Sequence, residues 1–488
     1  MTRTLPPPAA DTGEGRWSLR LWGLLIVLAG NMLIDALEVS VAVVALPSIA
    51  TDLALPLTEV QWAMTGFAVG FGGLMLFGAR VVSLLGRRRV YLAALCCFAA
   101  ASVLSALAQE PGLLLATRLV KGFCAALTAP TGLAIISTAF PEGRARTRAL
   151  SVYALFGAGG FTAGLLLSGW LTTYTWRLAF TFPAPVVLLL FAFGLRLIPA
   201  QDDTAGSAPP TAGRHYDIAG AVTFAGALLA LVNGIAALPG HGWHDPRATG
   251  SLAAAVLLLG AFWAVERTAA EPLLRTRPLR SRALRRSALG AACLNGSYLG
   301  LLFVLTHQMQ TVAGWSPLKT ALALVPAAAP PALTALASGR LVARFGAPRL
   351  IAAGAACAFA GYLLQLRPSW PLDYPGRLLP TLLLVGAGFV LSFAALNMQA
   401  TCELQPADRG AGSGLYQTAV QLAAVVVVAA VAALLAGPDT GAGPAAAIGA
   451  CRAALTLVAA LGGLGLLVAL TGLTPAAATR AARSAPRT

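Results

Sequence analysis

Two carboxylic acids, Asp35 and Glu38, lie inside an apolar stretch that runs from about residue 21 to residue 49. About 20 apolar residues suffice to cross a bilayer as a helix, and an acid at the centre of such a helix costs about 2.5 to 3.5 kcal/mol on insertion scales. Together with Asn31 the acids follow the spacing i, i+4, i+7, which keeps them within roughly 60 degrees of arc on one helix face. We therefore expect this polar stripe to line a water-accessible cavity or to face the fourth apolar segment, at 112–137.

Proton coupling is the chemistry that such an acid pair can perform. It needs a group whose protonation state changes between two accessible sides of a membrane, and two acids one turn apart titrate as a coupled pair. The fourth apolar segment supplies Arg118, which stays charged and can hold a deprotonated acid until substrate or a proton competes for it. Lys121, one turn further on, could neutralise the second acid or contact an anionic group of a substrate. The alternative for these residues is a static ion-pair cluster that only fixes helix packing.

The composition places these residues in a membrane protein. Of the 488 residues, 58% are hydrophobic and 11% charged, whereas soluble domains carry about 25% charged residues. The net charge of +16 does not indicate nucleic-acid binding, because the basic residues are scattered between apolar segments. The seven cysteines show no metal-ligand spacing, so we expect neither a metal site nor disulfides. The chain is predicted to be an all-α protein embedded in a lipid bilayer.

Fourteen apolar segments are long enough to span a bilayer. They lie at approximately 21–48, 62–85, 90–108, 112–137, 148–172, 178–199, 217–238, 249–266, 287–311, 316–338, 350–367, 375–398, 412–436 and 447–471. Basic clusters at 87–89, 144–148, 275–286 and 340–349 all fall in loops on one side of the membrane if the N-terminus is cytoplasmic. The positive-inside rule then places both termini in the cytoplasm.

An internal repeat divides the chain. "ARVVSLLGRRR" (79–89) follows the second apolar segment and "GRLVARFGAPR" (339–349) follows the tenth, each with a basic residue in second place and a glycine seven residues after the start. Corresponding loops of this kind predict two homologous bundles around a midplane site. We expect a six-helix bundle in 1–200, a linker with two additional transmembrane helices in 201–286, a second six-helix bundle in 287–475 and a cytoplasmic tail in 476–488.

Five motifs resemble those of the fourteen-helix drug:proton antiporters of the major facilitator superfamily. "LEVSVAVVALP" (37–47) is similar to the first-helix element L-D-x-T-x-x-x-x-A-L-P, with Glu38 in the place of the acid, and "RLVKG" (118–122) is similar to R-x-x-Q-G. "AGLLLSGWL" (163–171) falls where the antiporter motif G-P-x-x-G-G is expected, "WRLAF" (176–180) resembles W-R-x-x-F, and "QTVAGWSPLKTALALVP" (310–326) tracks Q-x-x-x-G-x-S-P-L-x-x-G-x-x-x-x-P. The resemblance implies the major facilitator fold and proton-driven drug export.

The chain departs from these motifs at a few positions. Ser83 and Leu84 stand where the inner-loop motif has Asp and Arg, Leu165 replaces the proline of the antiporter motif, and Ala321 replaces a glycine. In the family that Asp takes part in a charge network that latches the inward gate, so we expect a weaker or rebuilt latch here.

Gating residues are expected at both of these motifs. Small residues four apart in the fifth apolar segment allow close helix approach, which would serve either gating or plain tight packing, and the basic inner loop either gates or only sets topology. The candidates are Arg80, Gly86, Arg87, Arg88, Gly160, Gly164 and Gly169.

Polar side chains among the later apolar segments are candidates for contacting substrate. Such groups amid apolar walls suit a pocket for amphipathic organic molecules, although for each alone an interhelical hydrogen bond is the competing role. The candidates are Asn31, Lys121, Asn295, His307, Gln310, Asn397, Tyr416 and Gln417, with Gln421 nearby. His307 is also a possible second proton site, because imidazole titrates near neutral pH.

The sequence thus predicts a secondary active exporter of amphipathic drugs or antibiotics in a bacterial cell membrane, working by alternating access with inward proton flow. No phosphate-binding loop and no nucleophile, base and oxyanion arrangement occur, so neither ATP-driven transport nor enzymatic activity is expected. We expect no cofactor, no nucleic-acid partner and a monomer. The alternatives are a dedicated exporter of one metabolite, anionic if Lys121 contacts it, and a non-transporting membrane sensor or scaffold, suggested by the altered motifs.

Overall fold

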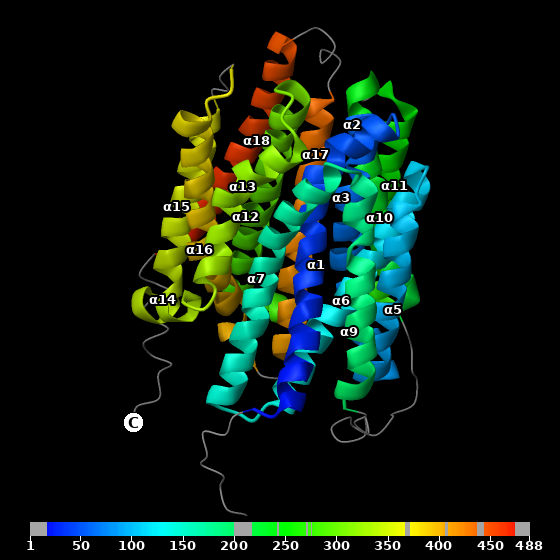
Figure 1. Ribbon diagram of the computed structural model, residues 1–488, viewed down its shortest axis with the longest axis vertical. Helices are drawn as coiled ribbons and strands as arrows, with labels where there is room; N and C mark the ends of the chain where they lie inside the picture. Colours follow the sequence, from blue (N-terminus) through cyan, green and yellow to red (C-terminus); the bar gives the residue numbers. More distant parts are fainter. Residues whose placement is uncertain are drawn as a thin grey trace, which may run out of the picture.

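The computed structural model describes residues 17–199, 217–241, 244–269, 272–274, 276–366, 371–405, 408–436 and 444–473. These ranges form a bundle of helices that run roughly along one axis (Figure 1). Twelve helices are long and apolar enough to cross a membrane, and two bent pairs raise the number to fourteen if each pair is one span. The predicted all-helical membrane fold is confirmed, and the exact count of fourteen spans stays a prediction.

The first half of the chain forms one group of helices around α1, which packs against α6, α7 and α9. Its elements are α1 (Leu19–Asp52), α2 (Leu57–Val60), α3 (Trp62–Ala68), the π-helix η1 (Val69–Gly73), α4 (Met75–Leu85), α5 (Arg87–Ala106), α6 (Pro111–Ala139), α7 (Arg144–Thr172), α8 (Trp176–Thr181) and α9 (Pro183–Leu197). We call the end of the bundle where α1 begins the inner end and the opposite one the outer end. In the predicted orientation the inner end is cytoplasmic.

The second half repeats this pattern after an intervening helical hairpin. The hairpin is α10 (Ile218–His241) and α11 (Pro246–Thr268), and a 3-10 turn, η3 (Pro278–Arg280), leads on from it. The second half then consists of α12 (Arg282–Thr306), the π-helix η4 (His307–Val312), α13 (Pro317–Thr334), α14 (Ser338–Phe345), α15 (Ala347–Gln365), the π-helix η5 (Tyr374–Leu378), α16 (Leu379–Cys402), α17 (Arg409–Leu435) and α18 (Pro444–Leu470). Residues 201–216 of the expected linker and the expected tail, 476–488, lie outside the described residues.

The inner-loop repeat has the same backbone geometry in both halves. Gly86 separates α4 from α5 with φ 88° and ψ 143°, and Gly346 separates α14 from α15 with φ 78° and ψ 142°. A side chain at such a positive φ would be strained, so both positions require glycine. Both preceding spans are also bent, by 52° between η1 and α4 and by 76° between α13 and α14. The sequence repeat therefore corresponds to a repeated turn.

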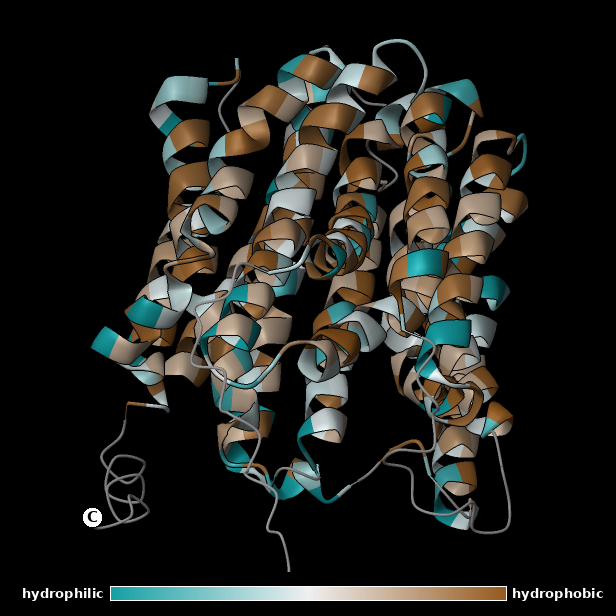
Figure 2. Cartoon of the chain, turned by 60° about the horizontal axis from the view of Figure 1, so that its bottom comes forward, coloured by the Kyte–Doolittle hydropathy of each residue, from teal (hydrophilic) through white to brown (hydrophobic). Residues whose placement is uncertain are grey.

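Apolar packing joins the hairpin to both halves. Val69 of η1, Leu228 and Val232 of α10, and Val425 and Ala429 of α17 form one buried cluster. The α10–α11 pair thus lies along the seam between the first half and α17, at the right of the bundle in Figure 1. Figure 2 shows hydrophobic residues along most of each helix and hydrophilic residues gathered at the inner end, as expected for a chain that crosses a bilayer.

Candidate functional site

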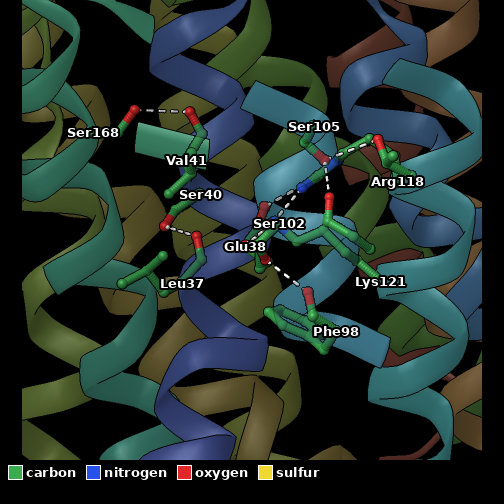
Figure 3. A network of polar contacts seen from close by, with 12 residues as sticks. Leu37, Glu38, Ser40, Val41, Phe98, Ser102, Ser105, Arg118, Lys121 and Ser168 are labelled. Atoms are coloured by element: carbon green, nitrogen blue, oxygen red, sulfur yellow. Dashed lines mark hydrogen bonds and ion pairs between the residues drawn. The ribbon is translucent and has the colours of Figure 1, made fainter. Parts of the chain in front are cut away.

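An ion-pair cluster lies where α1 crosses α6. The guanidinium of Arg118 and the ammonium of Lys121 each pair with one carboxylate oxygen of Glu38, and the three side chains have no solvent exposure (Figure 3). Arg118 also donates from Nη2 to the backbone oxygen of Glu38 at 3.0 Å. The spacing i, i+3 places the two cations on one face of α6, so both reach the same acid of α1.

Aromatic rings surround the two cations. The guanidinium carbon of Arg118 lies 4.9 Å from the centre of the Phe67 ring, and Lys121 Nζ lies 5.1 Å from that of Phe98. Phe180 of α8 contacts both cations, at 5.4 and 5.7 Å. Ring faces attract desolvated cations, so these contacts offset part of the cost of burial. The cluster has one acid for two cations and is enclosed by apolar rings.

A second polar cluster centres on Asp35, one turn before Glu38. Oδ2 of Asp35 accepts from Asn31 Nδ2 at 3.0 Å and from the hydroxyl of Thr128 at 3.1 Å. Its other oxygen, Oδ1, is buried and has no hydrogen-bond partner among the described residues. Thr128 was not among the predicted residues. Its position seven residues after Lys121, on the same face of α6, is the signal that could have identified it.

The polar stripe of α1 therefore faces α6, which is one of the two arrangements expected from the sequence. The other, a water-accessible cavity, is not what this conformation shows, because Glu38 is 0% and Asp35 3% exposed. The physical reason is that the cations of α6 and the hydroxyl of Thr128 occupy the places that water would take. If both acids are ionised, their formal charges cancel those of Arg118 and Lys121.

The glycines of α7 serve two different contacts. A Cβ at Gly160 or Gly164 would overlap backbone atoms of α1, at Leu33 and Leu37 respectively. The next small residue of this row, Ser168, donates to the carbonyl of Val41 at 2.9 Å (Figure 3). This row is thus tight packing within the first half. Gly169 lies on another face of α7, against Ala321 and Pro317 of α13 in the second half.

The inner-loop candidates run from the second half of α4 to the start of α5. Arg88 donates to the backbone oxygen of Leu195 at 2.7 Å, which ties α5 to the end of α9. The hydroxyl of Ser83, which stands where the family has Asp, bonds to the carbonyl of Arg80 on its own helix at 2.7 Å. Arg87 is exposed. The contact of Arg88 is within the first half, and the gating role of Arg80, Gly86, Arg87 and Arg88 stays a prediction.

The polar candidates of the second half are not brought together into one site. Asn295 donates to the carbonyl of Val420 on α17, and Gln310 donates to the carbonyl of Val44 on α1, both at 3.1 Å. Tyr416 is buried and its hydroxyl has no partner among the described residues. His307, Asn397 and Gln417 are partly exposed. Asn295 thus takes the interhelical role, and substrate contact stays a prediction for the whole set.

Trp176 lies at a helix end, where indoles commonly anchor a protein at the membrane interface. Trp176 is instead 2% exposed, and its Nε1 donates to Asp52 Oδ2 at 2.9 Å. Arg177 binds the same oxygen and lies over the Trp176 ring at 4.5 Å. The carboxylate of Asp52 at the end of α1 accepts the hydrogen bond of the indole, so this indole faces protein rather than the membrane surface.

Comparison with known proteins decides the family. A profile described as Major Facilitator Superfamily matches residues 28–428. The chain belongs to this superfamily. It is therefore a membrane transporter rather than an enzyme, and a multi-pass protein of the bacterial cell membrane.

Several relatives within the Major Facilitator Superfamily resist or export antibiotics. The chain is 34% identical to the puromycin resistance protein pur8 of Streptomyces alboniger, over 91% of this chain and 88% of the relative. It is 32% identical to the cephamycin export protein CmcT of Amycolatopsis lactamdurans, over 85% of each chain. The lincomycin resistance protein of Streptomyces lincolnensis is also 32% identical, over 85% of this chain and 84% of the relative.

Solved structures share the superfamily fold. The POT family transporter PepTSo matches with a TM-score of 0.61 at 14% identity, over 96% of this chain and 100% of that one. The nucleoside transporter NupG matches with a TM-score of 0.59 at 10% identity, over 93% of this chain and 98% of that one. At these identities the likeness concerns the fold alone.

Proposed function

We propose that this protein exports amphipathic antibiotics from the cytoplasm by alternating access, driven by inward proton flow. The observation that carries the proposal is the buried cluster of Glu38, Arg118 and Lys121, which joins two helices of the first half through a titratable acid. Export of antibiotics is supported by the relatives, whose names concern puromycin, cephamycin and lincomycin.

The cluster suits proton coupling for an electrostatic reason. Breaking a buried ion pair by removing one charge is strongly unfavourable, because the remaining charge is left without compensation. A proton delivered to Glu38 would remove the only acid that Arg118 and Lys121 share, so the α1–α6 contact would have to rearrange. Asp35 offers a second acid on the same stripe, with one oxygen free to receive a proton or a water molecule.

The alternatives are less well supported. A non-transporting sensor or scaffold is not favoured, since the relatives named above are resistance or export proteins and the similarity covers most of their length. A dedicated exporter of a single metabolite differs from our proposal only in its substrate range. A panel of antibiotics tested on a susceptible host that lacks its own pumps would separate the two.

The decisive experiment is proton-driven transport in proteoliposomes. We would measure antibiotic uptake into these proteoliposomes, by the protein inserted inside-out, under a pH gradient. Of the wild type and Glu38→Gln, we expect uptake only by the wild type. Glu142→Gln is the matched control, because Glu142 is an 87% exposed acid that pairs with Arg146 on the surface. Unchanged gradient-driven uptake in Glu38→Gln, with the protein folded, would remove this cluster from the mechanism.

A further inference from the structure

Three side-chain hydrogen bonds between described residues of the two halves have the same chemistry. Thr162 of α7 donates its hydroxyl to the carbonyl of Ala328 on α13 at 2.7 Å. Gln310 of η4 donates to the carbonyl of Val44 on α1 at 3.1 Å, and Thr418 of α17 donates to the carbonyl of Gly72 in η1 at 3.3 Å. In each case a neutral side chain of one half binds a backbone oxygen of the other.

Each accepting carbonyl lies near a proline or near a break in its helix. A proline has no N–H to bond the carbonyl four residues before it. Pro47 therefore leaves the carbonyl of Val43, the neighbour of Val44, without its helical donor. Pro331 does the same to the carbonyl of Ala327, the neighbour of Ala328. Gly72 lies in the last turn before the 52° break between η1 and α4, where carbonyls lose their intrahelical donors. Bent turns tilt carbonyls outward, so these oxygens are available to a donor from outside their helix.

The ion pairs of the two clusters described above, those of Glu38 and of Asp52, lie within the first half. Arg277 pairs with Asp408 at the start of α17. The contact between the halves at the outer end is instead made by close apolar packing, as at Gly169 and Ala321. Toward the inner end of α13, Leu333 is 83% exposed.

We infer that Thr162, Gln310 and Thr418 form a carbonyl latch that holds the halves together in the conformation closed at the outer end. This inference rests on the proposed alternating-access function. When the halves separate, each donor loses its partner, but no charge is left unpaired because donor and acceptor are neutral. The latch can therefore open and close with a small change in free energy. Ion pairs between the halves would be stronger and would keep the protein in the closed conformation.

The test uses variants that delete the donor and keep the shape. Thr162→Val, Gln310→Leu and Thr418→Val each remove one hydrogen bond between the halves. Thr381→Val is the matched control, because the hydroxyl of Thr381 donates to the carbonyl of Gly361 at 3.3 Å within the second half. All variants would be made in a background without native cysteines, with nitroxide labels on Tyr174→Cys and Pro371→Cys, two exposed positions near the outer ends of the first and second halves.

Pulsed electron paramagnetic resonance would measure the distance between these labels in lipid nanodiscs, without substrate or proton gradient. We expect each latch variant to raise the population with separated outer ends by about threefold relative to the closed one, as for an average hydrogen bond between membrane helices. The triple variant should raise it by about thirtyfold if the three sites act independently, and Thr381→Val should leave it unchanged.

Two results would overturn the latch. One is a triple variant with the same distance distribution as Thr381→Val, and the other is a wild type whose outer ends are always apart. Failure of the proposed function is separate, because it would show as a lack of gradient-driven transport in the wild type while the distances still respond to the latch variants.

Discussion

Gly169 of α7 lies so close to Ala321 of α13 that a Cβ on the glycine would overlap the methyl group of the alanine. The two residues come from opposite halves of the chain, and the same hypothetical Cβ would also crowd the backbone of Pro317 and Leu318. Closure of the halves at this end therefore depends on the absence of a side chain at position 169. Ala321 stands where the motif that residues 310–326 resemble has glycine, so this chain already has one methyl group at the contact between α7 and α13.

We predict that Gly169→Val prevents the closed arrangement of α7 and α13. Overpacking a close contact costs about 1 to 3 kcal/mol, which shifts a conformational balance by about fivefold to more than a hundredfold. Transport should fall accordingly, and adding Ala321→Gly should restore part of it. Gly159→Ala, on the same helix but with open space around it, is the control. Wild-type transport by Gly169→Val would contradict this interpretation.

The ion-pair cluster predicts an order of destabilisation. Glu38→Gln leaves two buried cations side by side, whereas Lys121→Met leaves one acid with one cation, Arg118. Loss of a partner from a buried pair costs about 3 to 5 kcal/mol, so Glu38→Gln should lower thermal stability in detergent far more than Lys121→Met. Equal melting temperatures for the two variants would show that Asp35, rather than Glu38, balances the cations.

The cluster at the outer end of the first half predicts non-additive effects. Trp176 and Arg177 donate to the same oxygen of Asp52, so Asp52→Asn weakens both interactions at once. We expect Trp176→Phe to cost about 1 kcal/mol, the net value of a typical hydrogen bond, and to cost much less in an Asp52→Asn background. A double-mutant cycle on thermal unfolding measures this coupling, and strictly additive losses would argue against a shared acceptor.

The two inner-loop turns predict equal sensitivity to a side chain. Gly86→Ala and Gly346→Ala each force an alanine into a region that is almost reserved for glycine, at a cost of about 1 to 3 kcal/mol. Gly339→Ala serves as control, since Gly339 lies in α14 without positive φ and with open space. Melting temperatures should fall in the first two variants and not in the third. A loss in only one of the two would contradict the structural equivalence of the repeats.

The helices and one of the two polar clusters could be predicted from the sequence. Long apolar segments must be helical in a bilayer because every backbone group needs an internal partner. The spacing of Asp35 and Glu38, and that of Arg118 and Lys121, put each pair on one helix face. The cost of acids against lipid left a water-accessible cavity or the fourth apolar segment as the surroundings of the stripe, and the structure brings Glu38 to both cations.

Contacts between distant segments could not be predicted in the same way. Thr162 and Thr418 carry no local signal, because a threonine in a helix usually bonds its own preceding turn. Burial of Trp176 depends on Asp52, which lies 124 positions earlier in the chain. Periodicity reports which face of a helix is polar, but not which carbonyl of another helix accepts a hydrogen bond from it.

The hairpin of α10 and α11 has a consequence for how the halves can move. Its buried cluster touches η1 on one side and α17 on the other, using only aliphatic side chains: Val69, Leu228, Val232, Val425 and Ala429. Dispersion contacts of this kind have no preferred direction, so they survive small sliding displacements that would break a hydrogen bond. If the halves rotate as proposed, the hairpin can therefore keep its contacts, and it would cover that side of the joint against lipid tails in each conformation.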